Sequence, residues 1–304
     1  MESKERRAAR RIGQLERHVG GRAEPTGGVL GWLSSLLGGG TQAEEGVDAV
    51  APEAVAVPDV SGIVQQCFSP PAKDDLEARK QAGWDWAREG RFIRQPVPEI
   101  DLGPEPAGEA VPPSHDALFG VSERALLCQT AEGYAKLKAG LPPHTHQYLS
   151  PERPGSAENI YVDGLEQWAL CIGDEFECGA DGAGPRLQLS SPRRPCERWN
   201  EVHGGDPEAD TNQNVRHFCM TNTLGGVFFR VIRAGKMKVG DTLSLVARPY
   251  PKWSVKRIGD LLYSGGGVPT EAWANWGGTR EELQELLEMP ELAHIEWKDV
   301  MKDL

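Results

Sequence analysis

Short apolar stretches of strand length, separated by turn residues, dominate the second half of the chain. Dipeptides such as Gly173-Asp174 and Gly240-Asp241 come just before such stretches, as turn residues do before strands. This spacing is typical of a β-barrel or a β-sandwich. The predicted strands are Asn159–Val162, Trp168–Ile172, Asp174–Cys178, Arg186–Ser190, Gly226–Ile232 and Thr242–Ala247.

Fewer strands and helices are predicted in the first half of the chain. Gly62–Phe68 has the composition of a strand that ends at two prolines, and Lys73–Glu89 has a helix-forming composition. Residues 95–116 are rich in proline, so we expect irregular structure there. Arg124–Gln129 is a candidate buried strand, and Thr130 is placed to cap a short helix that follows it.

After Pro251 the pattern becomes helical, and Thr279 followed by Glu282 forms a capping box. The predicted helices are Ser254–Leu262, Thr279–Met289 and Glu291–Met301. The expected fold class is mainly β with added helices: a β-barrel followed by a small α-helical unit. The expected domains are a disordered or helical tail and linker (1–60), the barrel (61–252) and the C-terminal helical unit (253–304).

Charge and cysteine content restrict the function and the compartment. The net charge of −12 argues against a nucleic-acid partner but allows a small anionic ligand in a local basic pocket. The apolar run Val29–Leu37 is too short to span a bilayer. None of the six cysteines forms a CxxC pair, so we expect free thiols in a reducing, cytoplasmic setting, and organelle targeting by residues 1–40 stays open.

The segment Ser191–Cys196 carries the strongest chemical signal in the chain. Pro192 and Pro195 fix the backbone on both sides of Arg193 and Arg194, which places two permanent cations beside the thiol of Cys196. Nearby cations favour the thiolate, which can bind a soft metal or accept sulfur, and an arginine can hold a phosphate. The alternative is a surface turn whose arginines are incidental.

This segment resembles the SxPRxPC signature of the MOSC family, the domain shared with the C-terminus of molybdenum cofactor sulfurase. Other segments in the matching order also resemble the family, and the helical C-terminus is similar to the three-helix unit of its YiiM-like branch. They are Glu158-Asn159-Ile160 with Gly164-Leu165 (family pattern FGENLxxxGL), Cys171-Ile172-Gly173-Asp174 (CIGD), Gly226–Val231 and Val239-Gly240-Asp241.

The resemblance implies a pyranopterin molybdenum cofactor bound in the barrel. Cys196 would be the molybdenum ligand and the catalytic residue, and the expected cofactor-binding residues are Arg193, Arg194, Asn159 and Glu158. The YiiM-like branch reduces N-hydroxylated bases or amines, which makes the expected partner a small-molecule substrate. The chain has no nicotinamide or flavin motif, so electrons would come from a separate flavin or haem protein.

Departures from the family pattern keep two other functions open. Phe119 and Val121 stand where the family has the His and a Gly of an HGG motif, and Ser156 stands where it has Phe. The chain could therefore be a non-catalytic, cofactor-binding barrel. It could also carry sulfur as a persulfide on Cys196, although residues 1–60 are too short for a pyridoxal-phosphate desulfurase domain.

The histidines and the remaining cysteines are weaker candidates. The sequence Val202-His203-Gly204-Gly205-Asp206 resembles the missing motif but follows Cys196 in a polar stretch, so we interpret it as a turn. His144 and His146 could share one face of an extended segment and bind a metal, but no third ligand lies nearby in the sequence. The other cysteines are expected to be small buried hydrophobic residues.

Overall fold

The computed structural model describes residues 57–69, 94–103, 122–180, 182–196, 198–263 and 277–298. Statements about the structure concern these ranges. The tail and linker up to residue 56, the helix predicted at Lys73–Glu89 and the motif positions Phe119 and Val121 lie outside them.

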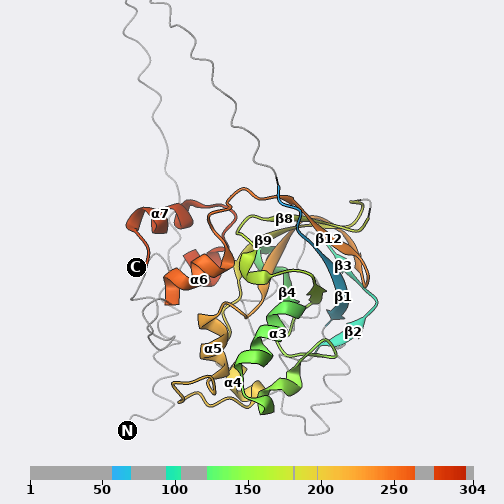
Figure 1. Cartoon of the computed structure of the whole chain (residues 1–304). Helices are drawn as coiled ribbons and strands as arrows, with labels where there is room; N and C mark the ends of the chain where they lie inside the picture. Colours follow the sequence, from blue (N-terminus) through green and yellow to red (C-terminus); the bar gives the residue numbers. More distant parts are fainter. Residues whose placement is uncertain are drawn as a thin grey trace, which may run out of the picture. The chain divides into compact units, whose positions relative to one another are not determined.

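Seven strands form a closed β-barrel, which confirms the predicted fold class (Figure 1). Their order around the barrel is β12-β8-β9-β10-β4-β7-β1, and the pairing of β1 with β12 closes it. The β4–β7 pair is parallel and the other pairs are antiparallel. The strands are β1 Ser61–Ser69, β4 Leu126–Thr130, β7 Ile160–Asp163, β8 Glu175–Cys178, β9 Arg186–Pro192, β10 Val227–Arg233 and β12 Thr242–Ala247.

The barrel strands follow the alternation of polar and apolar positions in the sequence. Along β8 and β12, Phe176, Cys178, Leu243 and Leu245 are buried, while the residues between them are half-buried. Because successive side chains of a strand point to opposite faces, these apolar residues meet inside the barrel. There the Phe176 ring packs edge-on against Phe229, with 5.8 Å between ring centroids.

Residues 95–102 form two short strands, so the expectation of irregular structure there is wrong. β2 (Gln95–Val97) extends the sheet beyond β1, and β3 (Glu99–Leu102) pairs with β11 (Gly235–Lys238), which the sequence did not predict. Proline lacks an N–H donor but is tolerated at a sheet edge, where one side of the strand needs no partner. β2 is such an edge strand, which explains how Pro96 is accommodated.

The strand predicted at Trp168–Ile172 is also wrong. The chain there forms the 3-10 turn η5 (Gln167–Ala169), and the only strand-like pairing is an isolated bridge from Cys171 to Ser254. The Gln167 side chain is buried and donates a hydrogen bond to the carbonyl of Thr223, 3.1 Å away. This tertiary bond holds the turn, and it cannot be inferred from a local apolar pattern.

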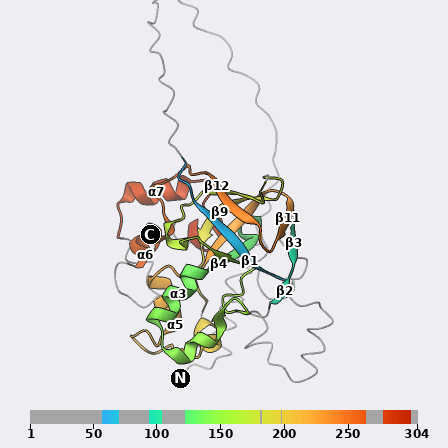
Figure 2. The same ribbon diagram turned by 45° about the vertical axis from the view of Figure 1, so that its right-hand side comes forward.

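Three helices gather beside one end of the barrel, α3 (Ala131–Gly140), α4 (Arg198–His203) and α5 (Val215–Thr221), as Figures 1 and 2 show. Thr130 caps α3 as predicted, since its side chain accepts a hydrogen bond from the Gly133 amide. The helices enclose a second hydrophobic cluster, which includes Phe68, Tyr134, Leu137, Leu149, Tyr161, Trp199, Val215, Cys219 and Leu224.

The C-terminal helices pack against the barrel core itself. α6 (Val255–Tyr263), α7 (Arg280–Glu288) and a π turn (His294–Lys298) follow β12, and the predicted capping box at Thr279 is confirmed. Trp253, Leu286 and Trp297 belong to the same cluster as the barrel strands. No helix within the described ranges has both the length and the apolar character needed to cross a bilayer.

Candidate functional site

The loop that links β9 to α4 carries the Arg-Arg-Pro-Cys segment, and neighbouring elements hold its backbone. The Arg193 amide donates to the Gly226 carbonyl at the start of β10 (2.9 Å). Arg216 of α5 donates from Nε to the Pro195 carbonyl (3.1 Å). The carbonyl of Cys196 accepts the first hydrogen bond of the following helix. The segment is therefore a positioned loop with contacts to three elements, rather than an isolated surface turn.

Cys196 is exposed, whereas the other five cysteines are buried. Burial raises the pKa of Cys67 and Cys178 to about 12 and that of Cys171 to about 11. Burial also raises the pKa of the Cys128 and Cys219 thiols. The five buried thiols thus have the small-hydrophobe role that the sequence predicted, and solvent reaches the thiol of Cys196.

The side chain of Arg193, three residues before this cysteine, is folded into the protein. The residue is 5% exposed, and its Nη1 atom has no hydrogen-bond partner. Its guanidinium carbon lies 5.2 Å from the ring centroid of Trp199, at the distance of a cation–π contact. A buried cation with an unsatisfied donor is costly unless an anion pairs with it. The arrangement therefore fits an anionic ligand.

Glu158 is the buried carboxyl group of the site. Tyr134 donates from its hydroxyl to Oε1 (2.6 Å), and the Ser156 amide donates to Oε2 (3.0 Å). Burial raises the pKa of Glu158 to about 7, against the opposing effects of these hydrogen bonds and of the positive charge on Arg193. Near neutral pH both the charged and the neutral form of this carboxyl are therefore populated.

A second arginine, Arg94, completes the charge cluster just before β2. Burial lowers its pKa to about 10; the charge of Glu158 opposes this shift, and that of Arg193 adds to it. The charges of Arg94 and Arg193 therefore both act on the Glu158 region of the site. Nothing in the local sequence marks Arg94, because its partners come from the distant β7 and β9 regions of the chain.

The position of His203 differs from the turn that the sequence predicted for it. The residue ends α4, is fully buried and packs its ring against Trp199, with 4.9 Å between ring centroids. Its Nε2 lies 3.0 Å from the Gly155 carbonyl oxygen. Burial lowers its pKa to about 4, and the nearby positive charge of Arg193 contributes to this. His203 is therefore a neutral packing residue behind Trp199 at physiological pH.

The other histidine candidates bind main-chain atoms instead of forming a metal site. His144 Nε2 lies 3.1 Å from the Gly204 carbonyl oxygen, and His146 Nε2 lies 2.9 Å from that of Leu141. Among the described residues, no group of three or more His, Cys, Asp or Glu side chains could hold a metal ion. A protein-only metal cage is therefore absent from this part of the chain.

Residues 114–244 match the family model of the MOSC domain. This part of the chain is similar to the MOSC domain. The matched range includes the site loop, the strands β4, β7, β8, β9, β10 and β11, and the helices α3, α4 and α5.

Curated relatives resemble the MOSC region over part of their own length. A protein named "Reductase" from Gibberella moniliformis is 32% identical over 139 residues, which are 46% of this chain and 22% of that protein. Protein YiiM from Escherichia coli is 28% identical over 131 residues, which are 43% of this chain and 52% of that protein. The crystal structure of YiiM from Geobacillus stearothermophilus shares the fold, with a TM-score of 0.51 and 18% identity, covering 79% of this chain and 96% of that one.

The MOSC pattern Phe-Gly-Glu appears here as Ser156-Ala157-Glu158, and the structure shows what each change requires. Ala157 has a φ of 58°, in the left-handed region that favours glycine, and it is buried. The hydroxyl of Ser156 accepts a hydrogen bond from Gln129 Nε2 (3.2 Å), which also donates to the Leu224 carbonyl (3.1 Å). Ser156, which stands where the family pattern has Phe, is thus part of a buried hydrogen-bond network.

Asn159 and Arg194, two of the predicted cofactor-binding residues, lie in surroundings that differ from those of the buried Arg193. The Asn159 side-chain oxygen accepts from the Leu127 amide (2.9 Å), and the Asn159 amide donates to the Leu127 carbonyl (2.8 Å). Asn159 thus holds β4 beside β7. Arg194 is half-buried next to Arg193. Cofactor binding by Asn159 and Arg194 stays a prediction.

The Cys171–Asp174 segment, which resembles a MOSC motif, has a structural role in this chain. Asp174 is fully buried and accepts two hydrogen bonds from Arg248, at 2.8 and 2.6 Å, and one from the Cys171 amide at 2.9 Å. Gly173, with a φ of 81°, makes the tight turn between them. This buried ion pair ties the start of β8 to the end of β12.

Proposed function

We propose that this chain binds a pyranopterin molybdenum cofactor at the Arg193–Cys196 loop and reduces N-hydroxylated bases or amines. The observation that carries the proposal is the buried Arg193, whose Nη1 atom has no partner, in the same loop as an exposed cysteine. The resemblance to the YiiM-like branch suggests the substrate class, and the relative named "Reductase" supports a reduction.

The residues present fit such a cofactor by their chemistry. A cysteine thiolate is a soft ligand that suits molybdenum, and Cys196 is the thiol that solvent reaches. The cofactor phosphate would find its counter-charge in Arg193. When bound, the cofactor supplies a centre that changes its oxidation state by two electrons.

The chain's own residues would position the ligand and manage protons. Reduction breaks the N–O bond of a hydroxylamine, consumes two electrons and two protons, and releases an amine and water. Glu158 can hold a proton on its carboxyl at neutral pH because burial raises its pKa to about 7. We propose that the electrons come from a separate flavin or haem protein, since the chain has no motif for either nicotinamide or flavin.

The test is a reductase assay on cofactor-loaded protein with 6-hydroxylaminopurine as substrate and chemically reduced viologen as electron source. Formation of adenine, measured by chromatography, is the expected result. Cys196→Ser should abolish it, and Cys178→Ala, which removes a buried thiol on β8, should not. Loaded protein without turnover would contradict the reductase and favour a non-catalytic cofactor-binding barrel. Gain of turnover in Phe119→His would then trace the loss to that position.

Sulfur transfer is the second candidate, favoured by the exposure of Cys196 next to arginines. A donor persulfide would pass its outer sulfur to the Cys196 thiolate, and the donor would leave as a thiolate. Mass spectrometry after incubation with a cysteine desulfurase and cysteine would show one added sulfur, absent in Cys196→Ser. An unmodified wild-type mass would argue against this function.

A further inference from the structure

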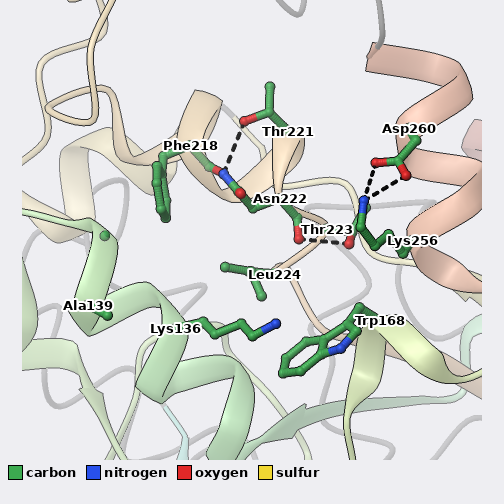
Figure 3. Close-up of a pocket in the computed structure, with 11 residues that line it drawn as sticks. Lys136, Ala139, Trp168, Phe218, Thr221, Asn222, Thr223, Leu224, Lys256 and Asp260 are labelled. Carbon is green, nitrogen blue, oxygen red and sulfur yellow. Dashed lines mark hydrogen bonds and ion pairs between the residues drawn. The ribbon is translucent and has the colours of Figure 1, made fainter.

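A cavity of about 360 Å³ lies outside the arginine cluster, between α3, η5, α5 and α6 (Figure 3). None of the residues that line it belongs to the Arg193, Glu158 and Cys196 site. Its size falls within the range of roughly 300–1,000 Å³ that is usual for small-molecule sites.

Aromatic side chains stand on opposite sides of this cavity. Phe218 of α5 and Trp168 of η5 face it from two sides, and the side chain of Leu224 lies between them, as Figure 3 shows. Both rings are half-buried. A flat aromatic molecule would therefore contact an apolar surface at each end of the cavity and cover the exposed parts of both rings.

The charges in the cavity favour a ligand with one negative group. Lys256 and Asp260 neutralise each other, with 2.7 and 2.6 Å between Lys256 Nζ and the two carboxylate oxygens. Lys136 Nζ lies 3.3 Å from the ring centroid of Trp168 and pairs with no carboxylate within the described ranges. Its ammonium group is thus the uncompensated charge among the described residues of the cavity, and it lies over the face of the Trp168 ring.

The wall of the cavity contains a strained residue. Thr223 has a φ of 55°, a left-handed conformation that a β-branched side chain rarely adopts. It is held by the hydrogen bond from Gln167 and by close packing on Gly259, where a Cβ atom would lie 1.9 Å from Thr223 Cγ2. Strained positions of this kind persist only where the surrounding structure over-determines them, and they are frequent at ligand sites.

We propose that this cavity is a second small-molecule site and that it binds a planar aromatic carboxylate. The ring would lie over Leu224, in contact with Phe218 and Trp168, and the carboxylate would pair with Lys136. This site goes beyond the proposed reductase function, because its lining and its ligand are separate from the Arg193–Cys196 loop.

The test is calorimetric titration of the full chain with 2-naphthoate, beside its neutral analogue 2-naphthamide. We expect one site with a dissociation constant below about 1 mM for 2-naphthoate, and binding of the amide weaker by roughly fivefold or more. Lys136→Gln should weaken 2-naphthoate by the same factor. Lys138→Gln, an exposed lysine on the same helix that does not line the cavity, is the matched control and should bind like wild type.

A variant that fills the cavity tests the site without changing its charge. Ala139 is exposed on α3 and lines the cavity, so Ala139→Trp should fill it, abolish binding and leave the circular dichroism spectrum unchanged. Failure of 2-naphthoate to bind wild type would overturn the proposal. Equal binding by wild type, Lys136→Gln and Ala139→Trp would also overturn it, because the probe would then be bound elsewhere.

Discussion

Replacing Glu158 by Gln should change how the stability of the protein depends on pH. Burial raises the pKa of Glu158 from 4.5 to about 7, so the folded protein holds a proton there that the unfolded chain has already released. Folding is then coupled to proton uptake between these two values. The stability contributed by the neutral carboxyl is fully present below pH 4.5 and is lost as the pH rises to about 7.

The size of the effect follows from the shift. One pKa unit corresponds to about 1.4 kcal/mol, so wild type should lose roughly 2.5 kcal/mol relative to Glu158→Gln between pH 5 and pH 8. His203 works in the opposite direction, because its lowered pKa favours folding as the pH rises through the range from about 4 to 6.5. It is present in both proteins and largely cancels from the difference.

The assay is urea unfolding of both proteins at pH 5, 6, 7 and 8. The quantity to compare is the difference between their free energies of unfolding at each pH. Leu137→Val, a buried change on α3 that removes no titratable group, is the control, and its difference from wild type should not vary with pH. A pH-independent difference for Glu158→Gln would refute the reasoning, since it would mean that Tyr134 and the Ser156 amide fully offset the burial of the charge.

Further predictions concern the thiols, the backbone and the buried ion pair. Ellman's reagent should modify one thiol in the native protein and none in native Cys196→Ser; a second reactive thiol in native wild type would contradict the burial of the other cysteines. Ala157→Gly should raise the free energy of unfolding by up to about 1 kcal/mol, because relief of the left-handed strain exceeds the entropy cost of glycine; a lower melting temperature would count against it. Arg248→Met should cost about 3–5 kcal/mol at pH 7 by leaving the Asp174 carboxylate buried and unpaired, and adding Asp174→Asn should recover part of this, as chemical denaturation can test.

The barrel could be predicted from the sequence where local rules decide the structure. The alternation in Thr242–Ala247 gives β12, and the side chains of Thr130 and Thr279 cap their helices as expected. The prediction failed where tertiary contacts outweigh local composition. β2 tolerates a proline because it is an edge strand, and Trp168 lies on a turn that a buried glutamine holds.

The site could be predicted only as far as its motif. The Arg-Pro-Cys segment indicated Cys196 and Arg193, but not that one side chain is exposed and the other buried. The partners Arg94 and Tyr134 come from distant parts of the chain and carry no motif. Their interactions with Glu158 form only after β2, α3 and β7 have come together, so no pattern along the sequence indicates these two residues.

Metal and pterin analysis is the most direct test of the proposed cofactor site. Wild type, Cys196→Ser, Arg193→Gln and the buried-thiol control Cys178→Ala would be expressed in a host that makes the molybdenum cofactor. The account predicts stoichiometric molybdenum and pterin in wild type and Cys178→Ala, loss of molybdenum in Cys196→Ser, and weaker retention of pterin in Arg193→Gln. Wild type without molybdenum or pterin, or Cys196→Ser with an undiminished molybdenum content, would contradict it.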